Sequence, residues 1–208
     1  MKNTKKETIG LLVIMEAKPG KAQAVKDFLL SGLDLVNQEP ETVSWFAFQI
    51  DKNTFGIFDT FKTEAGKQAH LKGEVAKALL ANADHLLENF DVNENIQPTN
   101  IIATNHKIGA QRKGLVVMLE AKARQSENVE RFLKVGKALV SNEPQTVSWY
   151  AIKLDNTRYA IFDTFADHSG RDAHLTGKVA AALMENAPLI LKDFNTNAIQ
   201  TIDILASK

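Results

Sequence analysis

The sequence repeats itself once, at a spacing of about 104 residues. Residues 10–90 align with residues 114–194 without a gap, and 38 of the 81 aligned positions are identical. Solenoid units are only roughly 20–50 residues long, so each copy is expected to be a domain-sized unit. We predict a first domain at residues 1–104, a linker at 105–113 and a second domain at 114–208.

Within each copy, the spacing of the apolar residues changes from strand-like to helix-like and back. In the first copy this predicts a strand, a helix, two strands joined by a hairpin, two helices and a last strand, at residues 10–18, 20–39, 42–50, 54–61, 63–72, 74–90 and 99–104. Thr63 and Asp167 are expected to cap the short helix, and Gly73 and Gly177 to interrupt it. The order β-α-β-β-α-β predicts the α+β class and two tandem ferredoxin-like units.

The strands of each copy are apolar on both faces. Neither residues 11–15 nor residues 45–48 alternate between apolar and polar side chains. Helices cover only one face of a ferredoxin-like sheet, and the other face would alternate if it lay in water. We therefore predict that the two copies pack sheet to sheet, as an intramolecular pseudo-dimeric α/β barrel. Whether this pseudo-dimer forms a further homodimer stays open.

Composition excludes several classes of function. The 25 basic side chains balance 25 acidic ones, so no net field draws the chain to nucleic acid or to an anionic membrane. The absence of cysteine excludes disulfides, thiolate nucleophiles and thiolate metal sites. The apolar run near the start is interrupted by Glu16, so it is a poor signal peptide and too short to span a membrane. We expect a soluble, cytoplasmic protein without nucleic-acid or membrane partners.

Three blocks that occur in both copies carry a family resemblance. They read EPETVSWFA, GIFDTF and TEAGKQAHLKG in the first copy, and EPQTVSWYA, AIFDTF and DHSGRDAHLTG in the second. Almost the whole chain thereby resembles, twice, the antibiotic-biosynthesis-monooxygenase-like domains of the dimeric α/β-barrel superfamily. The resemblance implies an oxidoreductase with a pocket between sheet and helices. Members include cofactor-free oxygenases of phenols and quinols, haem-degrading enzymes and many domains without an established activity.

The haem-degrading branch of that superfamily does not fit this chain. Its asparagine aligns with Met15 in the first copy and Leu119 in the second, and its tryptophan aligns with Phe61 and Phe165. Its axial histidine aligns with Leu79 and Leu183. Leucine cannot ligate iron. The chain also has no dinucleotide fingerprint, no phosphate loop and no His/carboxylate spacing typical of a metal site. We therefore predict no cofactor and no metal.

An aspartate stands inside each aromatic strand of the form IFDTF. If the hairpin pairs Ile50 with Phe55, alternation places Asp59 on the same face as Phe61, and Asp163 on the same face as Phe165. The resemblance implies that this face is turned to the helices, in an aromatic-walled pocket, because Phe61 matches the family's pocket-facing tryptophan. The residues predicted to contact substrate there are Ser44, Phe46, Phe61, Ser148, Tyr150, Tyr159 and Phe165. Trp45 and Trp149 then fall on the opposite side, turned towards the sister copy.

Asp59 and Asp163 are the candidate catalytic bases. Burial would raise their pKa towards the range that is useful for taking a phenolic proton. The structural alternative is that each aspartate pairs with a nearby Lys or His, or caps the following helix. His70 and His174 occur in both copies and are candidate proton shuttles, or they hold the aspartates in place. An Asp–His contact would fit both interpretations.

Two functions follow from these residues. The first is a cofactor-independent monooxygenase-like enzyme acting on a small aromatic substrate of the phenol or quinol type. It predicts an open cavity beside an aspartate, large enough for a ring. The alternative is a non-catalytic small-molecule-binding or stress-associated protein, in which the aspartates are locked in pairs. A third option, with the cavity filled by some of the 11 phenylalanines, leaves only association.

Overall fold

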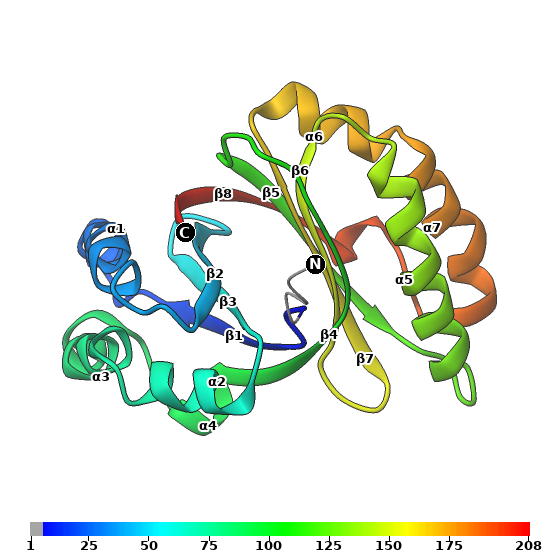
Figure 1. The fold of residues 1–208 in the computed structure, drawn as a ribbon. Helices are drawn as coiled ribbons and strands as arrows, with labels where there is room; N and C mark the ends of the chain where they lie inside the picture. Colours follow the sequence, from blue (N-terminus) through cyan, green and yellow to red (C-terminus); the bar gives the residue numbers. More distant parts are fainter. Residues whose placement is uncertain (1–5) are drawn as a thin grey trace, which may run out of the picture. The chain divides into compact units, whose positions relative to one another are not determined.

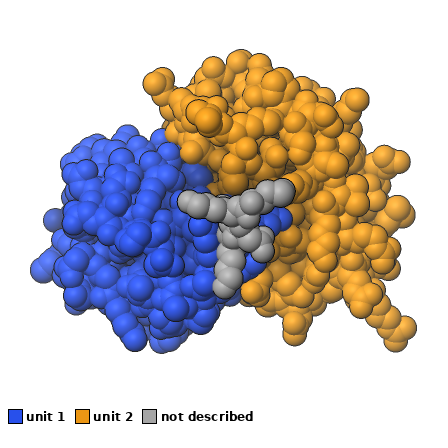
Figure 2. All heavy atoms as spheres, viewed as in Figure 1, with its two compact units in different colours: residues 1–99, 204–208 blue, residues 100–203 orange. Residues whose placement is uncertain are grey.

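The computed structural model describes residues 6–208. The chain divides into two compact units (Figure 2). Unit 1 contains residues 6–99 and 204–208, and unit 2 contains residues 100–203. Among residues 6–208, no helix is both long enough and apolar enough to cross a lipid bilayer.

Unit 1 is a sheet covered by helices on one side. Its elements are β1 (Ile9–Glu16), α1 (Ala22–Val36), β2 (Thr42–Gln49), β3 (Thr54–Phe61), α2 (Glu64–Leu71), α3 (Glu74–Leu86), α4 (Val92–Asn95) and the start of β4 (Ile96–His106). Helices α1 and α3 lie on the same side of strands β1, β2 and β3 (Figure 1). Their buried residues, such as Val25, Leu29 and Leu79, pack with Trp45 and Ile57 of the sheet.

Unit 2 repeats this arrangement. After the end of β4 it contains β5 (Lys113–Glu120), α5 (Ser126–Ser141), β6 (Thr146–Lys153), β7 (Arg158–Phe165), α6 (His168–Leu175), α7 (Lys178–Ile190), the short 3-10 helix η1 (Thr196–Ala198) and the start of β8 (Ile199–Ser207). The equivalent residues Val129, Leu133 and Leu183 pack with Trp149 and Ile161. The matching cores follow from the matching sequences of the two copies.

The eight strands close into a barrel in the hydrogen-bonded order β1-β3-β2-β8-β5-β7-β6-β4. Within unit 2, residues 100–106 of β4 pair with β6, and residues 199–203 of β8 pair with β5. Within unit 1, Lys208 exchanges backbone hydrogen bonds with Trp45. The predicted α+β class, the two ferredoxin-like units and the barrel are confirmed.

The last strand of each copy, β4 or β8, forms hydrogen bonds with a strand of the other copy. This pairing differs from the expected organisation. The last strand of the first copy was expected to complete its own sheet, but its residues 100–106 add to the second copy's strand β6. The segment predicted as a linker, residues 105–113, also includes the last two residues of β4 and the first residue of β5. The connection without regular structure is therefore shorter, at residues 107–112.

The predicted helix signals are confirmed. The Thr63 hydroxyl accepts a hydrogen bond from the Gly66 N–H at 3.1 Å, and the Asp167 carboxylate accepts one from the Gly170 N–H at 3.0 Å. Each side chain thereby satisfies an N–H that has no partner within its own helix. Gly73 and Gly177 are the N-cap residues of α3 and α7, and so separate the two helices of each copy.

The predicted hairpin register is wrong by one residue. Phe55 pairs with Gln49 instead of Ile50, and the Ile50 N–H donates to the Thr54 carbonyl at 2.9 Å. The reason is the turn. The Asp51 carboxylate accepts hydrogen bonds from the N–H groups of Asn53 and Thr54, each at 2.9 Å, and this tight turn brings Thr54 opposite Ile50. Because side chains alternate with a period of two, this shift moves the side chains of residues 44–49 to the other face of the sheet.

Two faces of the sheet therefore exchange their expected residues. Trp45 and Trp149 are the cross-strand neighbours of Asp59 and Asp163, on the helix-facing side. The substrate contacts that were expected from β2 and β6 lie on the face turned away from the helices. They are Ser44, Phe46, Ser148 and Tyr150, and their cross-strand neighbours are Thr60, Phe58, Thr164 and Phe162. Their predicted place beside the aspartates is wrong.

A close contact in this hairpin gives a testable prediction. Gly56 faces Phe48 across the strands, and a Cβ added to Gly56 would lie 2.2 Å from the Phe48 ring. In the second copy the same pair is Ala160 and Ile152. Gly56→Ala should lower the free energy of unfolding by about 1–3 kcal/mol, because the ring must move. Urea unfolding at pH 7 measures this.

The second copy supplies the control for this prediction. Gly56→Ala combined with Phe48→Ile recreates its Ala–Ile pair and should recover part of the lost stability. If the double variant lost as much as the two single variants added together, Gly56 and Phe48 would not be coupled.

Candidate functional site

Each unit contains a line of three ionisable side chains under its helical layer. In unit 1, Asp59 from β3 and His70 from α2 meet on the helix-facing side of the sheet. The His70 Nε2 lies 3.1 Å from the Asp59 Oδ2, and its Nδ1 lies 2.6 Å from the Glu39 Oε2. Glu39 comes from the loop between α1 and β2. The imidazole is therefore held between two carboxylates.

Unit 2 contains the same line with small differences. The His174 Nδ1 lies 2.6 Å from the Glu143 Oε2, and its Nε2 lies 3.3 Å from the Asp163 Oδ2. A threonine fixes the outer carboxylate in both units: the Thr42 hydroxyl donates to Glu39 at 2.8 Å and the Thr146 hydroxyl donates to Glu143 at 2.9 Å. Two copies of the sequence thus produce two copies of the site.

The line runs from the core towards the surface. The Asp59 side chain is 2% exposed, that of His70 is 7% and that of Glu39 is 18%. In unit 2 the corresponding values are 1%, 6% and 17%. The expected proximity of aspartate and histidine is confirmed, and the outer glutamate extends the line to water.

The pKa values reflect this arrangement. Burial raises the pKa of Asp59 and of Asp163, although the adjacent histidine opposes the shift. Burial also disfavours the charged form of the histidines, but the flanking carboxylates outweigh it and raise the pKa of His70 to about 9 and that of His174 to about 10. Both histidines are therefore cationic at neutral pH.

These shifts predict a loss of stability in alkaline solution. The folded-state pKa of each histidine lies above its ordinary value of 6.5, so its stabilising effect is complete below pH 6.5 and is lost as the pH rises through about 9 to 10. The raised pKa of the aspartates lowers the free energy of unfolding as the pH rises above their ordinary value of 3.8. Urea unfolding between pH 7 and pH 10.5 should show the free energy of unfolding falling.

NMR titration of the ring nitrogens identifies the groups responsible. Two imidazoles should stay protonated through pH 8. A control variant is His85→Gln, because His85 is exposed and lies outside both lines. It should keep the full pH dependence. Ring nitrogens of His70 and His174 that lose their protons between pH 6 and pH 7 would contradict the prediction.

Three buried polar atoms in or beside each line have no hydrogen-bond partner among residues 6–208. They are one carboxylate oxygen of the aspartate, Asp59 Oδ1 or Asp163 Oδ1, one of the outer glutamate, Glu39 Oε1 or Glu143 Oε1, and the indole nitrogen of the aspartate's cross-strand neighbour, Trp45 or Trp149. The Asp163 Oδ2 also lacks hydrogen-bond geometry towards His174. A hydroxyl group is the kind of ligand group that can donate to such a buried carboxylate oxygen.

The space above this face differs between the two units. In unit 1 a void of about 40 Å³ borders Trp45 and Ile57 under α1 and α3. In unit 2 a cavity of about 360 Å³ lies between α5 and α7, and a second one of about 270 Å³ borders His174 and Glu143. An apolar cavity of roughly 150 Å³ holds one benzene ring. The unit 2 cavities have room for a ring and the unit 1 void does not.

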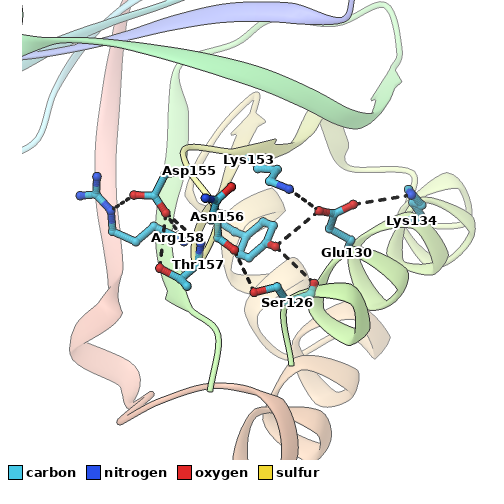
Figure 3. A network of polar contacts seen from close by, with 9 residues as sticks. Ser126, Glu130, Lys134, Lys153, Asp155, Asn156, Thr157 and Arg158 are labelled. Carbon is cyan, nitrogen blue, oxygen red and sulfur yellow. Dashed lines mark hydrogen bonds and ion pairs between the residues drawn. The ribbon is translucent and has the colours of Figure 1, made fainter. Parts of the chain in front are cut away.

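Of the remaining predicted contacts, Phe61 and Phe165 lie beside the histidines, with ring centroids 5.3 Å apart in both units. Tyr159 is held elsewhere, by contacts with Ser126 and Glu130 at the start of α5, which Figure 3 labels. Its hydroxyl donates to the Ser126 carbonyl at 3.2 Å and lies 3.5 Å from Glu130, which also pairs with Lys153 at 2.6 Å. The Tyr159 hydroxyl therefore joins strand to helix.

Ser148 belongs to a different cluster, on the other face of the sheet. Its hydroxyl donates to the Gln111 side chain at 2.8 Å and lies 3.4 Å from the His106 Nδ1. The Thr164 hydroxyl donates to the same Gln111 oxygen. Among residues 6–208, no group of three or more His, Asp or Glu side chains has the arrangement needed to hold a metal ion.

Glu39 and Glu143 are the site residues that sequence reasoning missed. A signal was present, because both lie in the repeated block EPxTVSW, together with Thr42 and Thr146. The periodicity of the sequence does not reveal them, because they lie in a loop, where it does not indicate which way a side chain points.

Comparisons with solved structures identify the fold. A candidate monooxygenase from Fusobacterium nucleatum is 14% identical with a TM-score of 0.81, over 97% of this chain and 94% of its own. A candidate monooxygenase from Lactobacillus acidophilus is 10% identical with a TM-score of 0.81, over 97% and 96%. The chain therefore shares the α/β-barrel fold of these two proteins.

A third structure places this barrel fold among ferredoxin-like proteins. It is a ferredoxin-fold protein from Listeria monocytogenes related to antibiotic biosynthesis monooxygenases, 8% identical with a TM-score of 0.53, over 98% of both chains. No family model and no curated protein matches the sequence. At these identities the likeness describes the fold, and the chemistry has to be argued from the site.

Proposed function

We propose that the chain is a cofactor-independent monooxygenase-like enzyme that acts on a small aromatic substrate of the phenol or quinol type, bound between the sheet and helices of unit 2. The observation that carries this proposal is the buried Asp163 carboxylate, which has an Oδ1 without a hydrogen-bond partner among residues 6–208. Its raised pKa suits it to take a proton from a phenol.

The line behind Asp163 holds the charges that this step needs. Asp163 takes the phenolic proton at Oδ1, becomes neutral, and later gives the proton to the oxygen atom that leaves as water. His174 is already protonated at both ring nitrogens, so it keeps its protons and pairs with the Glu143 carboxylate. The cationic imidazole also stabilises the negative charge that forms next to it.

The oxidation needs no external reductant. A hydroquinone and O₂ give a hydroxyquinone and water: one oxygen atom forms a bond to a ring carbon, and the other leaves as water. The ring supplies the four electrons that reduce O₂. The deprotonated ring is the electron-rich form that can transfer an electron to O₂, which is the role of the base.

The cavity between α5 and α7 is the proposed substrate site. A Cβ added to Gly136, in the wall of this cavity, would lie 3.4 Å from the Trp149 ring. Trp149 is in turn the cross-strand neighbour of Asp163. Neither Trp149 nor Asp163 lines the cavity, so the hydroxyl of a substrate bound there reaches Asp163 only if the Trp149 indole moves aside.

Oxygen uptake with hydroquinones of one, two and three rings tests the proposal. Uptake above the rate of spontaneous oxidation, with one atom from ¹⁸O₂ in the product, is the expected result. NMR spectra recorded without oxygen should show the same compounds binding to α5 and α7.

The second candidate function is a non-catalytic small-molecule-binding or stress-associated protein. It is favoured by unit 1, where the Glu39–His70–Asp59 line is complete but the void holds no ring. There the line joins a loop, a strand and a helix. Binding without oxygen uptake would overturn the enzymatic proposal and support this one.

A further inference from the structure

The cavity between α5 and α7 differs from its counterpart in unit 1 in charge as well as in size. Its walls are Asn128, Arg131, Phe132, Val135, Gly136, Leu139, Ala182, Asn186 and Ile190. Among these residues Arg131 is the only one with a charge. The aligned residue of the first copy is Asp27, of opposite sign.

The Arg131 guanidinium makes no hydrogen bond and no ion pair with any residue in the described range 6–208. The two amide side chains in the wall are already engaged: the Asn128 Nδ2 donates to Gln125 at 2.5 Å, and the Asn186 Nδ2 donates to the Ala182 carbonyl at 2.8 Å. Asp27, by contrast, accepts a hydrogen bond from Gln23 at 2.8 Å. The only charged donor that the wall offers to a ligand is therefore the Arg131 guanidinium.

The rest of the wall is suited to a ring. Phe132, Leu139 and Ile190 are apolar and at least half-buried, and Gly136 leaves space that any other residue would fill. A volume of about 360 Å³ lies within the range of roughly 300–1,000 Å³ for small-molecule sites. Helix α7 also contains Pro188, where α3 has Asp84. Proline removes a helical hydrogen bond and bends a helix, which fits a wider gap at the end of α7.

We propose that this cavity binds a small aromatic carboxylate, with the carboxylate on Arg131 and the ring against Phe132, Leu139 and Ile190. Guanidinium binds carboxylate through two parallel hydrogen bonds, so Arg131 fixes the orientation of the ring as well as its charge. The identification of this ligand as the substrate, an acidic phenol, rests on the proposed function. The binding of the carboxylate does not depend on that function.

Binding of benzoate and of benzyl alcohol to the full chain tests the inference, by isothermal titration and by NMR shifts of α5 and α7. The two probes have similar shape and differ in charge. Benzoate should bind about tenfold more tightly at low salt, because the partner is an exposed arginine. This preference should shrink at 0.5 M NaCl, where the screening length is only a few ångströms.

Variants assign the effect to the cavity. Arg131→Ala should bring the two probes to within about twofold of each other, and Arg131→Lys should keep part of the preference. Asp27→Ala, at the aligned position of unit 1, is the control and should change neither affinity. Ala182→Phe, which fills the cavity, should abolish the binding of both probes. A benzoate preference that survives Arg131→Ala, or binding that survives Ala182→Phe, would overturn the inference.

The outcomes separate this inference from the proposed function. If benzoate binds as expected but no phenolic acid stimulates oxygen uptake, the carboxylate site stands and the enzymatic proposal falls. If hydroquinones are oxygenated while Arg131→Ala has no effect on either probe, the enzymatic proposal stands and the carboxylate site falls.

Discussion

Replacing Asp163 by asparagine is expected to lower the rate of hydroquinone oxygenation by about 10²- to 10⁴-fold, the usual contribution of a positioned general base. Asparagine has nearly the same shape and keeps a hydrogen-bond acceptor, but it cannot take a proton at neutral pH. The substrate ring would then stay protonated, and transfer of an electron to O₂ would slow. The initial rate of oxygen uptake at saturating substrate measures this.

The aligned residue of the first copy is the matched control. Asp59→Asn removes the same group from the same line, but the neighbouring void is only about 40 Å³. The total rate should therefore change less than twofold. Equal losses in both variants would mean that the effect comes from folding rather than from the chemistry of unit 2, and an unchanged rate in Asp163→Asn would remove the proposed base.

Replacing His174 by leucine is expected to lower the free energy of unfolding by about 3–5 kcal/mol at pH 7. Leucine is close to histidine in volume, so the packing changes little. What is lost is the cation between Glu143 and Asp163, and both carboxylates stay in the interior without it. Urea unfolding followed by circular dichroism measures the change.

Two further variants separate the ion pair from general damage to α6. His168→Leu changes an exposed histidine of the same helix and should cost less than about 0.5 kcal/mol. His174→Leu combined with Asp163→Leu removes the carboxylate as well and should be more stable than His174→Leu alone. If the second substitution lowered stability further, the cost would not come from an uncompensated buried charge.

Much of the fold could be predicted because local and long-range signals agree. The repeat, the strand and helix periods and the caps at Thr63 and Asp167 each depend on a few neighbouring residues. The register of β2 could not be predicted, because it depends on how the Asp51 carboxylate closes the turn. A bulge between Thr42 and Ser44 shifts the strand again. An error of one residue there placed Trp45 and Phe46 on the wrong faces.

The site was predicted in part for a similar reason. Asp59 and His70 each lie on a regular element, so their faces follow from the period, and their contact was one of the expected outcomes. Glu39 reaches the same histidine from a loop, across 31 positions of the sequence. The cavities of units 1 and 2 differ although most of the residues around them are the same. The volume of each cavity depends on the distance between its two helices. A single exchange, such as Pro188 for Asp84, does not by itself predict that distance.

The crossing of β4 and β8 has a consequence for how the chain reaches its final state. Unit 1 includes residues 204–208, which the ribosome makes only after the rest of the second copy. The first copy can therefore collapse early, but its sheet keeps an unpaired edge until synthesis has passed residue 208. Each gene half expressed separately would leave such an edge open, so duplication within one polypeptide protects both halves from pairing with the wrong chain.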